Sequence, residues 1–138
     1  MDALYSAQAT AVGGRDGHVE TSDGLLKVEM SIPKSMGGPG RPDTTNPEQL
    51  FAMGYAACFG GAVGFVAKQQ KVVPSQITVT AHVHIGKQGE GLGLGVDLTV
   101  KVDGVDQATA EKLVQAAHQV CPYSKATRNN IEVKLNVA

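Results

Sequence analysis

The first third of the chain alternates between apolar and polar residues, which is the pattern of β-strands with one buried face. We expect three strands here, at residues 3–12, His18–Thr21 and 25–32, joined by glycine-containing turns at 13–17 and 22–24. The next segment, 33–45, holds three prolines and three glycines. This composition predicts a long irregular loop, which is either a plain crossover or a functional segment.

A long helix is predicted after this loop. Asn46 is a favourable N-cap and Pro47 suits the first helical position. Glu48 places a carboxylate in the first turn, where the helix dipole favours a negative charge. Gln49 occupies the third position, as in a capping box. We expect the helix to continue to about Lys71.

The centre of this helix raises the question of a membrane span. Residues 50–67 form an uncharged run of 18 residues, which is at the lower limit for crossing a bilayer. Nine of these 18 residues are Ala or Gly, which contribute little transfer energy. A helix that is apolar on all sides, in a chain that otherwise has the pattern of a water-soluble domain, is typical of a buried central helix. Its four glycines would allow another element to pack closely against it.

The second half of the chain predicts a hairpin, a helix, a short helical turn and a last strand. These elements are expected at 77–85 and 92–102 around a turn at 86–91, from an Asp106 N-cap to Cys121, at 123–130 and at 131–137. A chain of 138 residues fits one domain, spanning residues 1–138. The mixture predicts an α+β fold with mostly antiparallel sheets packed on two long helices.

The charge balance argues against two classes of partner. The chain has 12 basic and 13 acidic residues and a net charge of -1. Such a balance disfavours both nucleic-acid binding through phosphate neutralisation and a polybasic membrane anchor. The first residues show neither the basic nor the apolar region of a secretory signal. We therefore expect a cytoplasmic protein, with no nucleic-acid or membrane partner, whose two cysteines are kept reduced.

Four residues could carry chemistry, and each has a plainer alternative. Cys58 lies in the long apolar helix and Cys121 on the apolar face of the second helix, so both could be packing residues. If the two helices pack together, the same two thiols could instead form a catalytic redox pair. Arg15 lies between glycines in a turn, where it is either a solvated residue or a guanidinium directed inward. Glu48 is either a helix-start residue or a partner for such an arginine.

The histidines give little support for a metal site. His82 and His84 are two residues apart on one strand face, a spacing that can bind zinc, but no third ligand is evident. His18 and His118 have no obvious partner and are interpreted as surface groups. We expect neither a metal nor a bound cofactor.

Four segments together carry a resemblance to a known family. GGRDG at 13–17, SDG at 22–24, NPEQLFAMGYAACF at 46–59 and VCPYSKATRNN at 120–130 resemble, in the same order, the organic hydroperoxide resistance proteins of the osmotically inducible protein C superfamily. The resemblance covers essentially the whole chain. It implies an intertwined α+β homodimer around a central buried helix. It also implies a peroxidase that reduces alkyl or fatty-acid hydroperoxides and is reduced by a lipoyl-type dithiol, either dihydrolipoamide or a lipoylated protein.

The resemblance assigns roles by motif. It makes Cys58 the thiol that attacks peroxide and Cys121 the resolving thiol that forms a disulfide with it. It makes Arg15 the cation that favours the thiolate and Glu48 the carboxylate that orients Arg15. No departure from the family pattern occurs at these four positions.

Helix geometry predicts that each site is shared between two subunits. Glu48 and Cys58 are ten residues apart on one helix, which is roughly 15 Å along the axis and places them on different faces. One guanidinium cannot easily contact both within one chain. Two antiparallel copies of the helix would bring Glu48 of one subunit towards Cys58 of the other.

Two other classes of function stay open on the sequence alone. One is a non-catalytic, redox-responsive binding module, in which the Cys58–Cys121 pair only switches conformation. The other is a structural or ligand-carrying dimer with inert thiols. Turnover of an organic hydroperoxide distinguishes both from a peroxidase, because a module would react once and stop.

Overall fold

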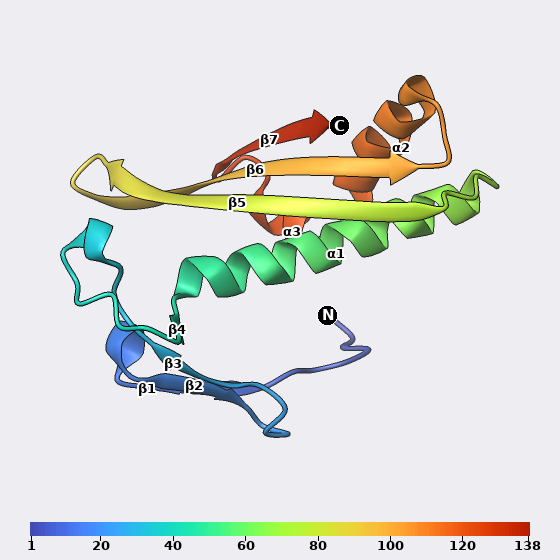
Figure 1. Ribbon diagram of the computed structural model, residues 1–138. Coiled ribbons are helices and arrows are strands. Elements are labelled where there is room, and N and C mark those ends of the chain that lie inside the picture. The colour runs from blue at the N-terminus through green and yellow to red at the C-terminus, as the bar shows by residue number, and fades with distance from the viewer. The chain divides into compact units, whose positions relative to one another are not determined.

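The structure is a computed structural model that describes all 138 residues. The chain divides into two compact units, Met1–Leu50 and Phe51–Ala138. The elements form two sheets and three α-helices (Figure 1), so the predicted α+β class is confirmed. That residues 1–138 form one domain stays a prediction.

The first unit contains a four-stranded sheet in the order β1-β2-β3-β4. Its strands are β1 (Ala9–Val12), β2 (His18–Thr21), β3 (Lys27–Met30) and β4 (Thr44–Thr45). The first three strands pair antiparallel, and β4 joins β3 in parallel. The predicted strand at 3–12 is too long, because β2 has four residues and its pairing with β1 begins only at Ala9.

Two connections in this unit are more ordered than the sequence suggested. The turn between β1 and β2 contains a short 3-10 helix, η1 (Gly14–Asp16). The predicted irregular loop 33–45 contains a second one, η2 (Lys34–Met36), together with β4. Gly17 is required after η1, because a Cβ at this position would lie 1.7 Å from the carbonyl oxygen of Val12. The chain therefore makes a tight turn around Arg15, as predicted for residues 13–17.

Helix α1 (Pro47–Gln69) begins as predicted and ends two residues early. Asn46 caps it, since its Oδ1 accepts a hydrogen bond of 2.9 Å from the backbone N–H of Gln49. The side chain of Gln49 does not complete a capping box; its Oε1 accepts instead from the hydroxyl of Thr45, at 2.8 Å. By length and composition α1 could span a membrane, but the core helix of a folded domain passes the same test.

The helix is buried on one face rather than all round. Six of its residues are buried: Tyr55, Phe59, Ala62, Val63, Val66 and Ala67. On another face, Met53 and Phe65 are 61% and 54% exposed. Ala57 and Gly61 between them are also exposed, so an apolar stripe at four-residue spacing is left uncovered in the single chain. We call these four residues the exposed stripe of α1.

The second unit contains a sheet in the order β5-β6-β7, made of β5 (Gln76–Gln88), β6 (Gly91–Asp103) and β7 (Glu132–Val137). β5 and β6 form the predicted hairpin, and β7 runs parallel to β6. The predicted turn at 86–91 is shorter in the structure, because both strands extend into it and only Gly89 and Glu90 lie outside them. Gly89 has φ +57°, a conformation that favours glycine.

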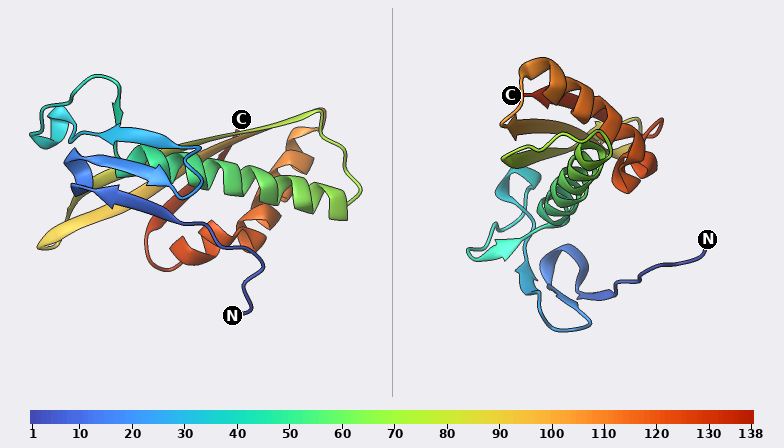
Figure 2. Two further views of the ribbon diagram at one scale, coloured as in Figure 1. Left: turned by 90° about the horizontal axis from the view of Figure 1, so that it is seen from below. Right: turned by 90° about the vertical axis from the view of Figure 1, so that its right-hand side faces the viewer.

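Two further helices, α2 (Gln107–Val120) and α3 (Pro122–Thr127), connect this hairpin to β7. The Asp106 N-cap is confirmed, since its Oδ1 accepts a hydrogen bond of 2.7 Å from Thr109 N–H. α1 and α2 lie against the same face of the β5-β6-β7 sheet (Figure 2). Their buried residues and those of β6 form one hydrophobic core, which includes Cys121.

Candidate functional site

The two cysteines lie side by side in the second unit. Cys58 is in the middle of α1, and Cys121 is the single residue between α2 and α3. Their sulfur atoms are 3.6 Å apart and both thiols are free. A disulfide needs an S–S distance of about 2.05 Å, which a small rotation of the side chains can provide. Of the two alternatives that the sequence left open, the structure has the one in which the two thiols lie in contact.

The two thiols differ in exposure. Cys121 has no exposed surface, whereas Cys58 is half-buried. An incoming reagent can therefore reach Cys58 and not Cys121. Burial raises the pKa of Cys58, and a backbone hydrogen bond from Tyr123 opposes this effect only in part. The thiol by itself is thus mostly protonated at neutral pH, and it needs a nearby cation to become a strong nucleophile.

The first unit contains an organised cation. The guanidinium of Arg15 donates two hydrogen bonds to the Glu48 carboxylate, from Nη1 at 2.9 Å and from Nη2 at 2.7 Å. This bidentate pairing lowers the pKa of Glu48 and raises that of Arg15, so both groups stay charged. Two of the five guanidinium N–H groups are used, and three can bind something else. Arg15 is therefore not the plain solvated turn residue of the alternative interpretation.

A second arginine, which the sequence reasoning missed, fastens the turn that carries Arg15. Arg41 donates from Nη1 to the Asp16 carboxylate at 3.0 Å and from Nη2 to the carbonyl oxygen of Met30 at 2.8 Å. Arg41 comes from the glycine- and proline-rich segment that was predicted to be an irregular loop. Nothing in the sequence around Arg41 indicates that its side chain binds a residue 25 positions earlier in the chain.

A buried polar network includes residues before and after Cys121 in the chain. Tyr55 on α1 shares hydrogen bonds with two hydroxyls of α3, Ser124 at 2.9 Å and Thr127 at 3.1 Å. His118 Nδ1 lies 2.9 Å from the same Ser124 Oγ. The prediction that His118 is a surface group is wrong, because packing of α3 against the end of α2 covers it. Burial and the adjacent Arg128 lower the pKa of His118, so its ring is neutral at pH 7.

Aromatic rings form a wall beside the thiols. The rings of Phe51, Tyr55 and Tyr123 have centroids 5.7 to 6.2 Å apart. Gly54 permits this arrangement, since a Cβ there would lie 3.0 Å from the Tyr123 hydroxyl oxygen. Tyr55 and its neighbour on α1, Phe59, have no exposed surface and belong to the core. Tyr123 was missed, and it is 39% exposed.

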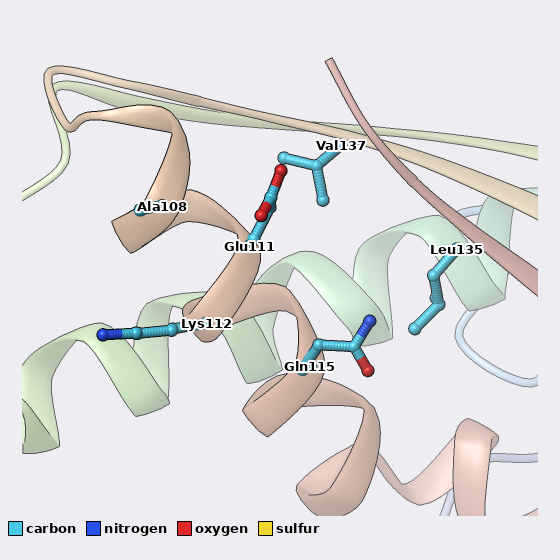
Figure 3. Close-up of a pocket in the computed structure, with 6 residues that line it drawn as sticks. All are labelled: Ala108, Glu111, Lys112, Gln115, Leu135 and Val137. Atoms are coloured by element: carbon cyan, nitrogen blue, oxygen red, sulfur yellow. The ribbon is translucent and has the colours of Figure 1, made fainter.

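The second unit also has a hollow that neither thiol lines. An open hollow of about 460 Å³ between α2 and β7 (Figure 3) is lined by Ala108, Glu111, Lys112, Gln115, Leu135 and Val137. It contains no thiol, imidazole or hydroxyl group. Its polar side chains are a carboxylate, an ammonium group and an amide, none of which is redox-active, so the paired thiols remain the candidate reaction centre.

The histidine pair of β5 differs from its prediction. His82 and His84 do have a third potential ligand, Asp97 on the neighbouring strand. The statement that no third ligand is evident is therefore wrong. These three residues lie on the face of the sheet away from the core, and they take no part in the thiol site.

Comparisons with known proteins show the family of the chain. A family model described as OsmC-like protein matches residues 38–136. The organic hydroperoxide resistance protein of Xanthomonas axonopodis pv. citri is 51% identical over 136 residues, which cover 98% of this chain and 95% of that protein. The organic hydroperoxide resistance protein OhrB of Bacillus subtilis is 46% identical over 138 residues, 98% of each chain.

Solved structures give the same result. The crystal structure of Bacillus subtilis OhrB has a TM-score of 0.90 to this chain and covers 99% of it, with 100% of that chain matched. An organic hydroperoxide resistance protein OsmC of Legionella pneumophila has a TM-score of 0.93 at 49% identity, covering 99% of both chains. The chain therefore belongs to the OsmC-like family and, within it, to the organic hydroperoxide resistance proteins.

Proposed function

We propose that the protein is a thiol-dependent peroxidase that reduces alkyl and fatty-acid hydroperoxides to alcohols. The names of its relatives support a role in organic hydroperoxide resistance and a peroxide-related redox function. The observation that carries the finer proposal is the 3.6 Å separation between the sulfur atoms of Cys58 and Cys121. A reactive thiol with a second thiol already in contact can form a sulfenic acid and resolve it without a large movement.

The reaction proceeds in three balanced steps. The Cys58 thiolate attacks the distal oxygen of the hydroperoxide, the O–O bond breaks, and the products are a Cys58 sulfenic acid and an alkoxide that takes up a proton. The Cys121 thiol attacks the sulfenic sulfur, which releases water and leaves the Cys58–Cys121 disulfide. An external dithiol then reduces this disulfide by exchange and becomes a disulfide itself.

The difference in exposure supports this assignment of roles. Cys58 is the thiol that a hydroperoxide can reach, whereas Cys121 is shielded from peroxide and can react only with the oxidised Cys58. Shielding also protects Cys121 from over-oxidation. The rings of Phe51 and Tyr123 next to α1 provide an apolar surface for an alkyl chain, which hydrogen peroxide cannot use.

Arg15 and Glu48 complete the site in this proposal. The cation compensates for the burial that raises the pKa of Cys58, and it also stabilises the negative charge on the leaving alkoxide. Glu48 fixes the plane of the guanidinium through its two hydrogen bonds. The negative charge of Glu48 partly cancels the effect of the Arg15 charge on the Cys58 thiolate. Arg15 can therefore lower the pKa of Cys58 only if one of its N–H groups contacts the sulfur directly.

The site is proposed to be shared within an intertwined homodimer, with Arg15 and Glu48 of one subunit serving Cys58 and Cys121 of its partner. The exposed stripe of α1, Met53, Ala57, Gly61 and Phe65, supports the dimer. Small residues at its centre let a second copy of the helix approach closely, and burying its two large side chains would favour association by the hydrophobic effect. No cofactor is part of this scheme.

A turnover assay tests the proposal. Cumene hydroperoxide and hydrogen peroxide are supplied separately with dihydrolipoamide as reductant, and the consumption of each peroxide is followed over many equivalents of protein. We expect sustained turnover that is much faster with cumene hydroperoxide. Consumption of a single equivalent followed by arrest would instead favour a redox-responsive binding module. We expect the natural reductant to be a lipoyl-type dithiol in the cytoplasm, where thiols are kept reduced.

A further inference from the structure

The β5–β6 hairpin carries a cluster of metal-binding side chains that the thiol chemistry does not use. One donor atom each of His82, His84 and Asp97 lies within 4.8 Å of the other two. The imidazole rings have centroids 4.3 Å apart, and His84 Nε2 lies 3.1 Å from Asp97 Oδ2. We propose that these three residues form a binding site for a divalent transition-metal ion, with Zn²⁺ as the representative ion.

The strand register explains why these side chains converge. Residues two apart on a strand point to the same face, so His82 and His84 are neighbours along β5. Asp97 on β6 is directly opposite His82, and Gly95 is directly opposite His84. Because Gly95 has no side chain, the His84 ring can lean across the pair towards Asp97. The three donors therefore come from a rigid, fully paired hairpin rather than from a loop.

The donor set suits an ion of intermediate softness. Two neutral imidazoles and one carboxylate are a common ligand set for Zn²⁺ and are also used for other divalent transition metals. Bonds of about 2.0–2.2 Å place tetrahedral ligand atoms about 3.3 Å apart, so the three donors need to move closer by a modest rotation. Rotation is unhindered, because the side chains of His84 and Asp97 are 49% and 35% exposed. The ion takes the place of the contact between His84 Nε2 and Asp97 Oδ2.

Space for the remaining coordination position exists beside the cluster. A hollow of about 240 Å³ adjoins His84, and glycines at 86, 93 and 95 contribute much of its lining. Glycines leave the backbone accessible at this end of the hairpin. A water molecule or a small ligand can therefore complete the coordination sphere of a three-residue site.

A positively charged neighbour on β7 limits the affinity. Lys134 is directly opposite Asp97 in the sheet register, and its ammonium group lies 3.7 Å from a carboxylate oxygen of Glu132. Lys134 competes with a cation for the Asp97 carboxylate, because all these groups share one solvent-facing side of the sheet. We therefore expect micromolar binding, on the order of 1–100 μM, rather than the tighter binding of a closed structural zinc site.

The test measures Zn²⁺ binding in a background that lacks both thiols, Cys58→Ser/Cys121→Ser, because thiolates bind zinc themselves. Isothermal titration calorimetry with zinc chloride should give one ion per chain. His84→Gln and Asp97→Asn should each weaken binding at least about tenfold, since one of three ligands is lost. Lys134→Gln should strengthen it. The matched control His18→Gln, on β2, should leave the affinity unchanged.

A second measurement needs no variant at the site. Titration of the same background protein with paramagnetic Co²⁺ should broaden the ring resonances of His82 and His84 and leave those of His18 and His118 sharp. Absence of one-to-one binding, equal loss of affinity in His18→Gln, or broadening of all four histidines alike would overturn the proposal. This outcome is independent of the peroxidase proposal, because both cysteines are absent.

Discussion

At the scale of single residues, the exposure of the two thiols decides what each can do. Cys58 is reachable and Cys121 is closed off, although their sulfur atoms are 3.6 Å apart. A residue that reacts first must be accessible, and a residue that resolves must be close but protected. Substitutions at Cys58, Cys121 and Arg15 test these requirements separately.

Serine substitutions should distinguish the two thiols. Cys58→Ser removes the attacking sulfur and should abolish peroxidase turnover. Cys121→Ser should consume about one equivalent of organic hydroperoxide and then stop when no external thiol is present, because the sulfenic acid has no partner. Peroxide consumption and mass spectrometry of the oxidised chain check both results. Parent activity in Cys58→Ser would contradict the assignment.

Replacement of Arg15 should move the pH dependence of the reaction. Burial raises the pKa of Cys58, and Arg15 is proposed to oppose this effect. Arg15→Ala should therefore raise the pKa further and shift the rise of activity to higher pH, because the thiolate forms only above the pKa. Thiolate absorbance as a function of pH measures the shift.

Lys27→Ala provides the matched control. It removes one positive charge from the same unit, but its partner is Glu20, at 3.2 Å, rather than Glu48. We expect a much smaller change in the pKa of Cys58. Equal titration curves for the parent and Arg15→Ala would remove Arg15 from the mechanism.

At the scale of elements, the junction between α2 and α3 is held to α1 by polar contacts inside the core. Cys121 sits at this junction, and the Tyr55 hydroxyl binds two hydroxyls of α3. His118 at the end of α2 shares one of them. The network therefore holds the helices on both sides of Cys121.

Removal of one hydroxyl tests how much this network stabilises the fold. Tyr55→Phe removes the two buried hydrogen bonds that join α1 to Ser124 and Thr127 of α3 and should lower the free energy of unfolding by about 1–3 kcal/mol. Urea denaturation measures the difference, with exposed Tyr5→Phe as the control that should change nothing. If both variants unfolded at the same urea concentration as the parent, the network would not contribute to stability.

Local signals explain which elements could be predicted. The start of α1 and the start of α2 depend on short-range caps at Asn46 and Asp106, and both were predicted correctly. The length of β1 depends on its partner strand, and the burial of His118 depends on how α3 packs. These are long-range properties, which a pattern of neighbouring residues does not contain.

The candidate site divides in the same way. Cys58, Cys121, Arg15 and Glu48 were identified by motif, and the structure pairs the thiols with each other and the two charged groups with each other. Asp97 was missed because the predicted turn was centred one residue too early. That register places Gly95 opposite His82, whereas the actual register places Asp97 there.

At the scale of the whole molecule, the exposed stripe of α1 is an apolar surface that the single chain does not cover. Two large apolar side chains, Met53 and Phe65, are more than half exposed around small residues. A homodimer that covers this stripe would also let each subunit supply Arg15 and Glu48 to the thiols of the other.

Mixing two inactive variants tests the shared site. At neutral pH, below the raised pKa that we expect for Cys58 in Arg15→Ala, the Cys58→Ser and Arg15→Ala homodimers should each show little or no activity. A heterodimer would contain one site with an intact Cys58 and an intact Arg15. After subunit exchange we expect up to about a quarter of parent activity, because half of the dimers are mixed and each has one working site. Exchange is verified by mass spectrometry of the intact dimers. Complete exchange without recovery of activity would contradict the shared site.

The contact between the two sulfur atoms also makes the reduced protein a chelating dithiol for elements that bind sulfur strongly. A trivalent arsenical forms two bonds to sulfur from one arsenic atom, and two thiols 3.6 Å apart can close that ring with little movement of the helices. The disulfide form offers no thiol to such a reagent. Immobilised phenylarsine oxide should therefore retain the reduced chain and release the oxidised one, so that a simple column would separate the two redox states of the pair.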